Sequence, residues 1–120
     1  MLAALLACAT PSPLVGDTLT EDGTWRLVLD QTTYDQGQVS IQLAAYVAQD
    51  ATPATGLDVM VRPDMPDMDH LRDLVFFVEE EAGSYTTSLL LDMPGLWTLT
   101  GYAQVEEHAE SFTFVVEALP

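Results

Sequence analysis

The sequence predicts an all-β protein, a seven-stranded immunoglobulin-like antiparallel β-sandwich, and three observations lead to this fold class. Seven short segments alternate apolar and polar residues with the period of two that is typical of a strand with one buried face. Turn-forming residues separate these segments at intervals of roughly 8 to 15 residues. No segment shows the apolar period of an amphipathic helix. The chain has 120 residues, which is enough for one domain with its own core.

Each predicted strand is bounded by residues that favour turns or interrupt pairing. Asp35-Gln36-Gly37 is a turn signal before the clearest strand, Pro63 ends the third one, and Met93-Pro94-Gly95-Leu96 is typical of a type II turn. We expect strands over 25–29, 39–47, 57–62, 71–80, 85–91, 97–105 and 112–116. The indole of Trp25 or Trp97 is expected to fill the core between the two sheets.

The first residues indicate export and lipid anchoring. Residues 1–8 are apolar and end in Leu5-Leu6-Ala7-Cys8, which resembles the lipobox of bacterial lipoprotein signal peptides. The alternative is a coincidentally apolar N-terminus, because no Lys or Arg precedes the run. We therefore expect a signal segment over 1–8 with lipidation at Cys8, a flexible tether over 9–23 and the sandwich over 24–120. These predictions make the protein a membrane-anchored, extracytoplasmic lipoprotein.

Charge and composition exclude several classes of function. Nineteen acidic residues against three basic ones give a formal net charge of −16, which repels nucleic acids and anionic lipid headgroups and attracts cations. The sequence has no Gly-rich phosphate loop, no Ser/His/Asp set that can be placed, and no cysteine nucleophile within the predicted fold. We expect a binding protein and not an enzyme.

One segment, Asp64-Met65-Pro66-Asp67-Met68-Asp69-His70, carries the candidate chemistry. Thioethers and imidazole are ligands for soft metal ions. In an extended strand Met65 and Met68 would lie on opposite faces, roughly 10 Å apart. Pro66 and Asp67 instead favour a β-turn, which brings the flanking Cα atoms within about 7 Å. The segment is therefore a candidate Cu(I) site with Met65, Met68 and His70 as ligands.

A fourth ligand follows from the alternation of strand direction. In a sandwich of this kind, the loop that holds Met65 and the loop that holds Met93 emerge at the same end. His108 emerges at the opposite end, where we expect a solvated hairpin residue. The predicted metal site is therefore Met65, Met68, His70 and Met93, with Cu(I) as its ion.

Three alternatives remain open at this stage. The methionines could be core residues that fill gaps under the sheet. Four carboxylates could bind Ca²⁺, although the segment lacks the central Gly and the final Glu of an EF-hand loop. The domain could also bind a protein rather than a metal, presenting a strand edge or its acidic face to a cationic partner. The four carboxylates are those of Asp64, Asp67, Asp69 and Asp73.

The chain resembles the YtkA-like family of bacterial extracytoplasmic domains, which are also similar to the periplasmic part of FixH-type proteins. The resemblance depends on three stretches between residues 37 and 118, namely Met65-Pro66-Asp67-Met68-Asp69-His70, Gly83-Ser84-Tyr85-Thr86 and Met93-Pro94-Gly95-Leu96-Trp97-Thr98-Leu99. Asp69 and Leu71 depart from the small residues that usually flank the histidine.

The resemblance implies an immunoglobulin-like sandwich, export by a signal or lipoprotein peptide and, for some members, copper handling during respiratory-oxidase assembly. Met65, Met68, His70 and Met93 match the positions suspected of binding copper. The implied partners are a copper ion and a respiratory protein that receives it.

Overall fold

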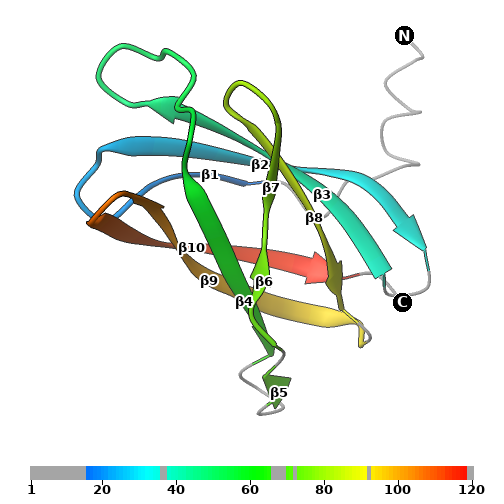
Figure 1. The fold of residues 1–120 in the computed structure, drawn as a ribbon. Coiled ribbons are helices and arrows are strands. Elements are labelled where there is room, and N and C mark those ends of the chain that lie inside the picture. The colour runs from blue at the N-terminus through cyan, green and yellow to red at the C-terminus, as the bar shows by residue number, and fades with distance from the viewer. Residues whose placement is uncertain (1–15, 36–37, 66–69, 72, 92, 119–120) are drawn as a thin grey trace, which may run out of the picture.

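A computed structural model describes residues 16–35, 38–65, 70–71, 73–91 and 93–118, and this part of the chain forms two antiparallel β-sheets (Figure 1). The predicted all-β sandwich is confirmed. The described part of the chain contains no helix capable of crossing a lipid bilayer.

The first sheet has five strands in the order β1-β2-β3-β8-β7. Its strands are β1 (Gly16–Leu19), β2 (Trp25–Asp35), β3 (Gln38–Val47), β8 (Ser84–Leu90) and β7 (Val78–Glu81). The second sheet has the order β10-β9-β4-β5, and β6 also pairs with β4. Its strands are β10 (His108–Ala118), β9 (Gly95–Val105), β4 (Asp58–Met65), β5 (His70–Leu71) and β6 (Val75–Phe76).

The core lies between the sheets and follows from the period of two. On β3, residues 39, 41, 43 and 45 are buried while the alternate residues face outward. Trp25 is 5% exposed and Trp97 is fully buried, so both indoles fill the core, as predicted for at least one of them. Gly101 allows β9 to approach β4, because a Cβ built there would lie 1.9 Å from the carbonyl oxygen of Met60.

The predicted seven-strand count is wrong, chiefly because the single strand expected over 71–80 is divided. β6 pairs with β4 in the second sheet, whereas β7 pairs with β8 in the first. The chain crosses between the sheets at Phe77, whose backbone N–H donates to the carbonyl of Val59 at 2.9 Å. Phe77 packs against the core while Phe76 and Val78 are each 61% exposed. A period of two therefore persists through a segment that changes sheets.

The predicted tether is also too long. Residues 16–19, placed within it by the sequence, form β1 and pair with β2. Thr20 is only 3% exposed. Gly16 allows this close packing, because a Cβ there would lie 2.5 Å from Cδ1 of Phe114 on β10. Residues 1–15, including the predicted signal segment and Cys8, lie outside the described residues.

The sandwich has two chemically different ends. The polar end contains residues 20–24, 48–57, 82–83 and 106–110, and the methionine end contains the end of β4, β5 and residues 93–95. Strand β9 connects them, and its 11 residues span roughly 33 Å. In Figure 1 the β9–β10 hairpin lies at the left, and β9 begins at the lower right.

Candidate functional site

The methionine end contains the backbone of two predicted ligands in register. Met65 is the last residue of β4, and its Cα partner on β5 is His70. Residues directly opposite in antiparallel strands have Cα atoms about 4.5–5.5 Å apart. Met65 is 4% exposed and belongs to the hydrophobic core, which agrees with the packing alternative and also leaves its thioether dehydrated.

The turn that carries Met93 lies beside Met65. A Cβ built on Gly95 would be 3.4 Å from Cε of Met65, so the methionine side chain reaches the start of β9. Met93 is half-buried against the core, and its carbonyl accepts a hydrogen bond from Nε1 of Trp97 at 2.9 Å. The end predicted for Met93 is therefore confirmed, and Trp97 fixes the backbone of this turn.

Not every predicted ligand falls within the described residues. Met68 lies outside them, as do Asp67 and Asp69 of the calcium alternative. Asp64 is half-buried on β4 and Asp73 is exposed. The structure brings Met65, the backbone of His70 and the Met93 turn to one end of the sandwich.

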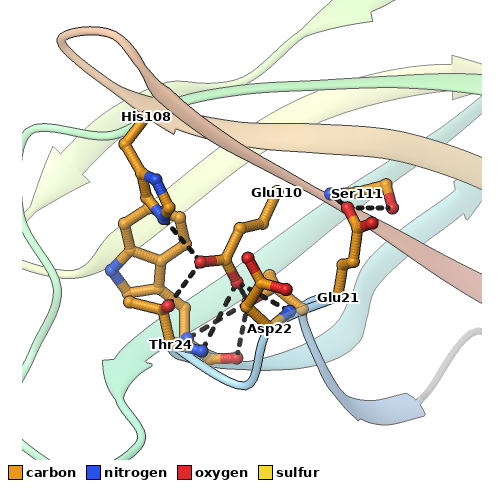
Figure 2. Close-up of polar contacts among 8 residues, drawn as sticks. Glu21, Asp22, Thr24, His108, Glu110 and Ser111 are labelled. Atoms are coloured by element: carbon orange, nitrogen blue, oxygen red, sulfur yellow. Dashed lines mark hydrogen bonds and ion pairs between the residues drawn. The ribbon is translucent and has the colours of Figure 1, made fainter.

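The polar end contains a carboxylate that the sequence analysis missed. Glu110 is 1% exposed on β10 and is surrounded by hydrogen-bond donors from the β1–β2 turn (Figure 2). Its Oε1 accepts from the Thr20 hydroxyl at 2.5 Å and from the backbone N–H of Asp22 at 3.2 Å and of Thr24 at 3.4 Å. Its Oε2 accepts from the Thr24 hydroxyl and lies 2.6 Å from Nε2 of His108.

The local sequence explains how the turn surrounds the carboxylate. Gly23 adopts a φ of 76°, which favours glycine, and its N–H donates to the carbonyl of Thr20 at 2.8 Å. This tight turn directs the N–H groups of Asp22 and Thr24 toward one point. A further hydrogen bond links this turn to β10, because the N–H of Glu21 donates to the carbonyl of Ser111 at 2.9 Å.

These contacts determine the ionisation of Glu110. Burial raises the pKa of its carboxyl group, but the hydrogen bonds from Thr20, Thr24, His108 and the Asp22 backbone stabilise the carboxylate more strongly. The net effect lowers the pKa from 4.5 to about 2. Glu110 is therefore a buried negative charge at any physiological pH.

His108 lies at the end of the sandwich that the sequence predicts, but it is not simply a solvated hairpin residue. Its side chain is 54% exposed and contacts Glu110 on one side. Its ring centroid lies 5.7 Å from that of Trp25, at an interplanar angle of 57°. Asp22, His108 and Glu110 each place one ligand atom within 4.8 Å of the others, which is an arrangement that could hold a metal ion.

One sequence signal could have identified Glu110. It lies on the same parity of β10 as Phe112, Phe114 and Val116, all of which face the core. A charged residue at a core-facing position is rare unless it has partners. The partners themselves were not visible, because Thr20 and Thr24 lie 90 and 86 residues away in the chain.

A hollow of about 390 Å³ opens on the outer face of the second sheet. Met60 lines it and lies opposite Tyr102 and Phe76 in register. Tyr102 and Phe76 are 51% and 61% exposed. The hollow is lined by Met60, Arg62, Asp64, Leu74, Thr100, Gly101 and Tyr102.

A family model described as YtkA-like matches residues 17–101, which is more than half of the chain. The chain belongs to the YtkA-like family. The matched range starts within β1 and so includes residues that we had assigned to the tether. It includes Met65 and Met93 but ends before His108 and Glu110. Neither the curated proteins nor the solved structures compared with this YtkA-like chain gave a significant match.

Proposed function

We propose that this YtkA-like protein is a non-catalytic, extracytoplasmic copper carrier anchored to the membrane by lipid at Cys8. Cu(I) would bind to Met65, Met68, His70 and Met93 and be transferred to a respiratory oxidase during its assembly. The observation that carries the proposal is the contact of Met65 with the start of β9, together with its pairing to His70. These contacts support convergence of ligands that lie up to 28 residues apart in the sequence.

The surroundings of Met65 suit a soft, weakly hydrated ion. Cu(I) prefers thioether and imidazole ligands, which need no charge, and its affinity depends on a shell that excludes water. Met65 is 4% exposed and Trp97, two residues after Gly95, is fully buried. A hard cation such as Ca²⁺ would require several oxygen ligands that this buried position does not supply.

The proposal is tested by competition of the protein with a Cu(I) chelator under anaerobic conditions. Every protein in the series carries Cys8→Ser, because a free thiolate would itself bind Cu(I). Met65→Leu, Met68→Leu and Met93→Leu keep the side-chain volume and remove the sulfur. Each is expected to weaken Cu(I) retention by tenfold or more, a loss of about 1.4 kcal/mol.

The matched control is Met60→Leu, which removes a thioether from the outer face of the same strand. It should retain Cu(I) as the parent does. If the parent retains no Cu(I), or if the three variants at the methionine end behave like Met60→Leu, copper carriage is excluded and these methionines are packing residues.

A second candidate function is protein interaction, which the exposed apolar residues around the hollow favour. Phe76 and Tyr102 flank Met60 on its two neighbouring strands, and both side chains are more than half exposed. An interaction domain would bind its partner normally after Met65→Leu and Met68→Leu. It would lose that partner after Phe76→Ser or Tyr102→Ser. A copper carrier with no partner at this face would keep its Cu(I) binding in both variants.

A further inference from the structure

We propose that Asp22, His108 and Glu110 form a second metal site, specific for a borderline divalent transition-metal ion of the Zn²⁺ class. This inference is independent of the copper proposal, because it concerns the opposite end of the sandwich and a different set of ligands. One imidazole nitrogen and two carboxylate oxygens suit Zn²⁺. They do not suit Cu(I), which prefers sulfur, or Ca²⁺, which takes about six to eight oxygens.

The exposed ligands would have to move toward Glu110 to share an ion with it. The three ligand atoms lie within 4.8 Å of one another, and Zn²⁺ binds such atoms at about 2.0–2.2 Å. His108 and Asp22 are exposed, so their side chains can rotate, whereas Glu110 is buried and fixed. Figure 2 shows Asp22 and His108 on either side of the Glu110 carboxylate.

Glu110 is held as a ligand by groups that would not bind the metal themselves. Its Oε1 accepts the Thr20 hydroxyl and two backbone N–H groups, so this oxygen is committed to the turn. Its Oε2 accepts a hydrogen bond from the Thr24 hydroxyl and lies against Nε2 of His108. The metal ion would replace only the contact with His108. Trp25 packs against the His108 ring and limits its orientation. Such outer partners orient ligands in known metal sites.

The charge balance is the second observation that favours a cation. Asp22 and Glu110 present carboxylates within 4.8 Å of each other. Among the described residues, neither forms an ion pair with an arginine, and Arg26, which lies four positions from Asp22, is paired with Asp17. Within the described part of the chain, the basic side chain in contact with these carboxylates is that of His108, whose Nε2 lies 2.6 Å from Oε2 of Glu110. A divalent ion would neutralise both carboxylates.

Binding would join parts of the chain that the backbone connects only distantly. Asp22 belongs to the turn between β1 and β2, whereas His108 and Glu110 begin β10 in the other sheet. An ion held by both segments binds the folded state and not the unfolded one, so it stabilises the fold in proportion to its concentration. Metal binding would therefore stabilise the contact between the β1–β2 turn and the start of β10.

The inference is tested by titrating the metal-free full-length chain with Zn²⁺ and following heat and melting temperature. All proteins carry Cys8→Ser, because a thiolate also binds Zn²⁺. We expect one ion per chain and a rise in melting temperature that the same concentration of Ca²⁺ does not produce. Asp22→Asn and His108→Gln alter exposed side chains, and each should weaken binding by roughly 10- to 100-fold.

Two control variants make the outcome decisive. Glu107→Gln removes an exposed carboxylate from the same hairpin without touching the site, and it should bind Zn²⁺ as the parent does. Met65→Leu should also bind Zn²⁺ normally, which separates this result from the fate of the copper proposal. Circular dichroism confirms that each variant is folded. Absence of stoichiometric Zn²⁺ binding, or equal binding by the parent, Asp22→Asn and His108→Gln, would overturn the inference.

Discussion

The two ends of the sandwich are stabilised by different interactions, hydrogen bonds to a buried carboxylate at one end and apolar packing at the other. At the polar end a buried carboxylate gathers hydroxyl and N–H donors from a turn in the other sheet, and each contact depends on direction and charge. At the methionine end Met65 packs into an apolar core beside Gly95, and packing depends mainly on volume. The comparison predicts that the buried Glu110 carboxylate and its donors tolerate almost no substitution, whereas the exposed residues of the polar end do. The methionine end should tolerate an apolar residue of similar volume, so the effect of removing sulfur on Cu(I) binding can be separated there from an effect on stability.

The largest effect is expected from Glu110→Ala. The substitution removes the carboxylate acceptor of the buried Thr20 hydroxyl and of the partly buried Thr24 hydroxyl and Asp22 N–H. We expect a loss of about 3–5 kcal/mol in the free energy of unfolding, measured with urea in the presence of a metal chelator. Glu117→Ala, at an exposed position on the same strand, is the matched control and should cost less than about 0.5 kcal/mol. Equal losses from the two variants would mean that the carboxylate contributes nothing specific.

Acid should lower the free energy of unfolding through the same carboxylate. The pKa of Glu110 is about 2 in the folded protein against 4.5 for an ordinary glutamate, so the unfolded state takes up the proton first. The stabilisation is therefore complete above about pH 4.5 and is lost as the pH falls toward 2. Urea unfolding at pH 6 and at pH 3 measures this loss, and Glu110→Gln should show a smaller difference between the two. An identical pH dependence in both proteins would contradict the assignment.

Tyr85→Phe tests another polar contact at this end. The buried hydroxyl of Tyr85 donates to the carbonyl of Ala54 at 2.8 Å and accepts from the N–H of Leu57 at 3.0 Å. Removing it leaves both backbone groups without that partner, and we expect a loss of about 1–3 kcal/mol in the free energy of unfolding. Tyr102→Phe, at a 51% exposed position, serves as the control and should be nearly neutral. A neutral Tyr85→Phe would show that the loop finds other partners.

The smallest effect on stability is expected at the methionine end. Met65→Leu conserves volume and should cost less than about 1.5 kcal/mol, again by urea unfolding. Met65→Ala should cost about 2–5 kcal/mol, because it opens a cavity in the core. If Met65→Leu is as damaging as Met65→Ala, the position is not a simple packing site, and the comparison between the two ends fails.

The features that could be predicted follow from the local period of two and from the order of the strands along the chain. The alternation over 39–47 predicted β3 almost residue for residue, and the alternation of strand direction placed His108 away from Met65. The strand β1 was missed because Gly-Asp-Thr-Leu is four residues long with one large apolar side chain. Its position depends on Phe114, nearly 100 residues further along the chain.

The candidate sites show the same limit. The methionine end could be proposed as a site because most of its candidate ligands lie within one short segment of sequence. The Glu110 cluster could not, since a Glu-Glu-His-Ala-Glu hairpin is typical of solvent-exposed charge until the turn that covers it is known. Likewise, the division of 71–80 between two sheets depends on which edge strand each half meets, and no local pattern encodes that choice.

The short strand β7 has a consequence for how the molecule behaves among copies of itself. As the last strand in the order of the first sheet, it presents its unpaired backbone edge to solvent. An uncovered edge is a template onto which another chain can add a strand. Here the edge is four residues long and three of them are glutamates, which are exposed. A second copy would have to bring its own excess of negative charge against this edge, so the addition of its strand to β7 is opposed by electrostatic repulsion.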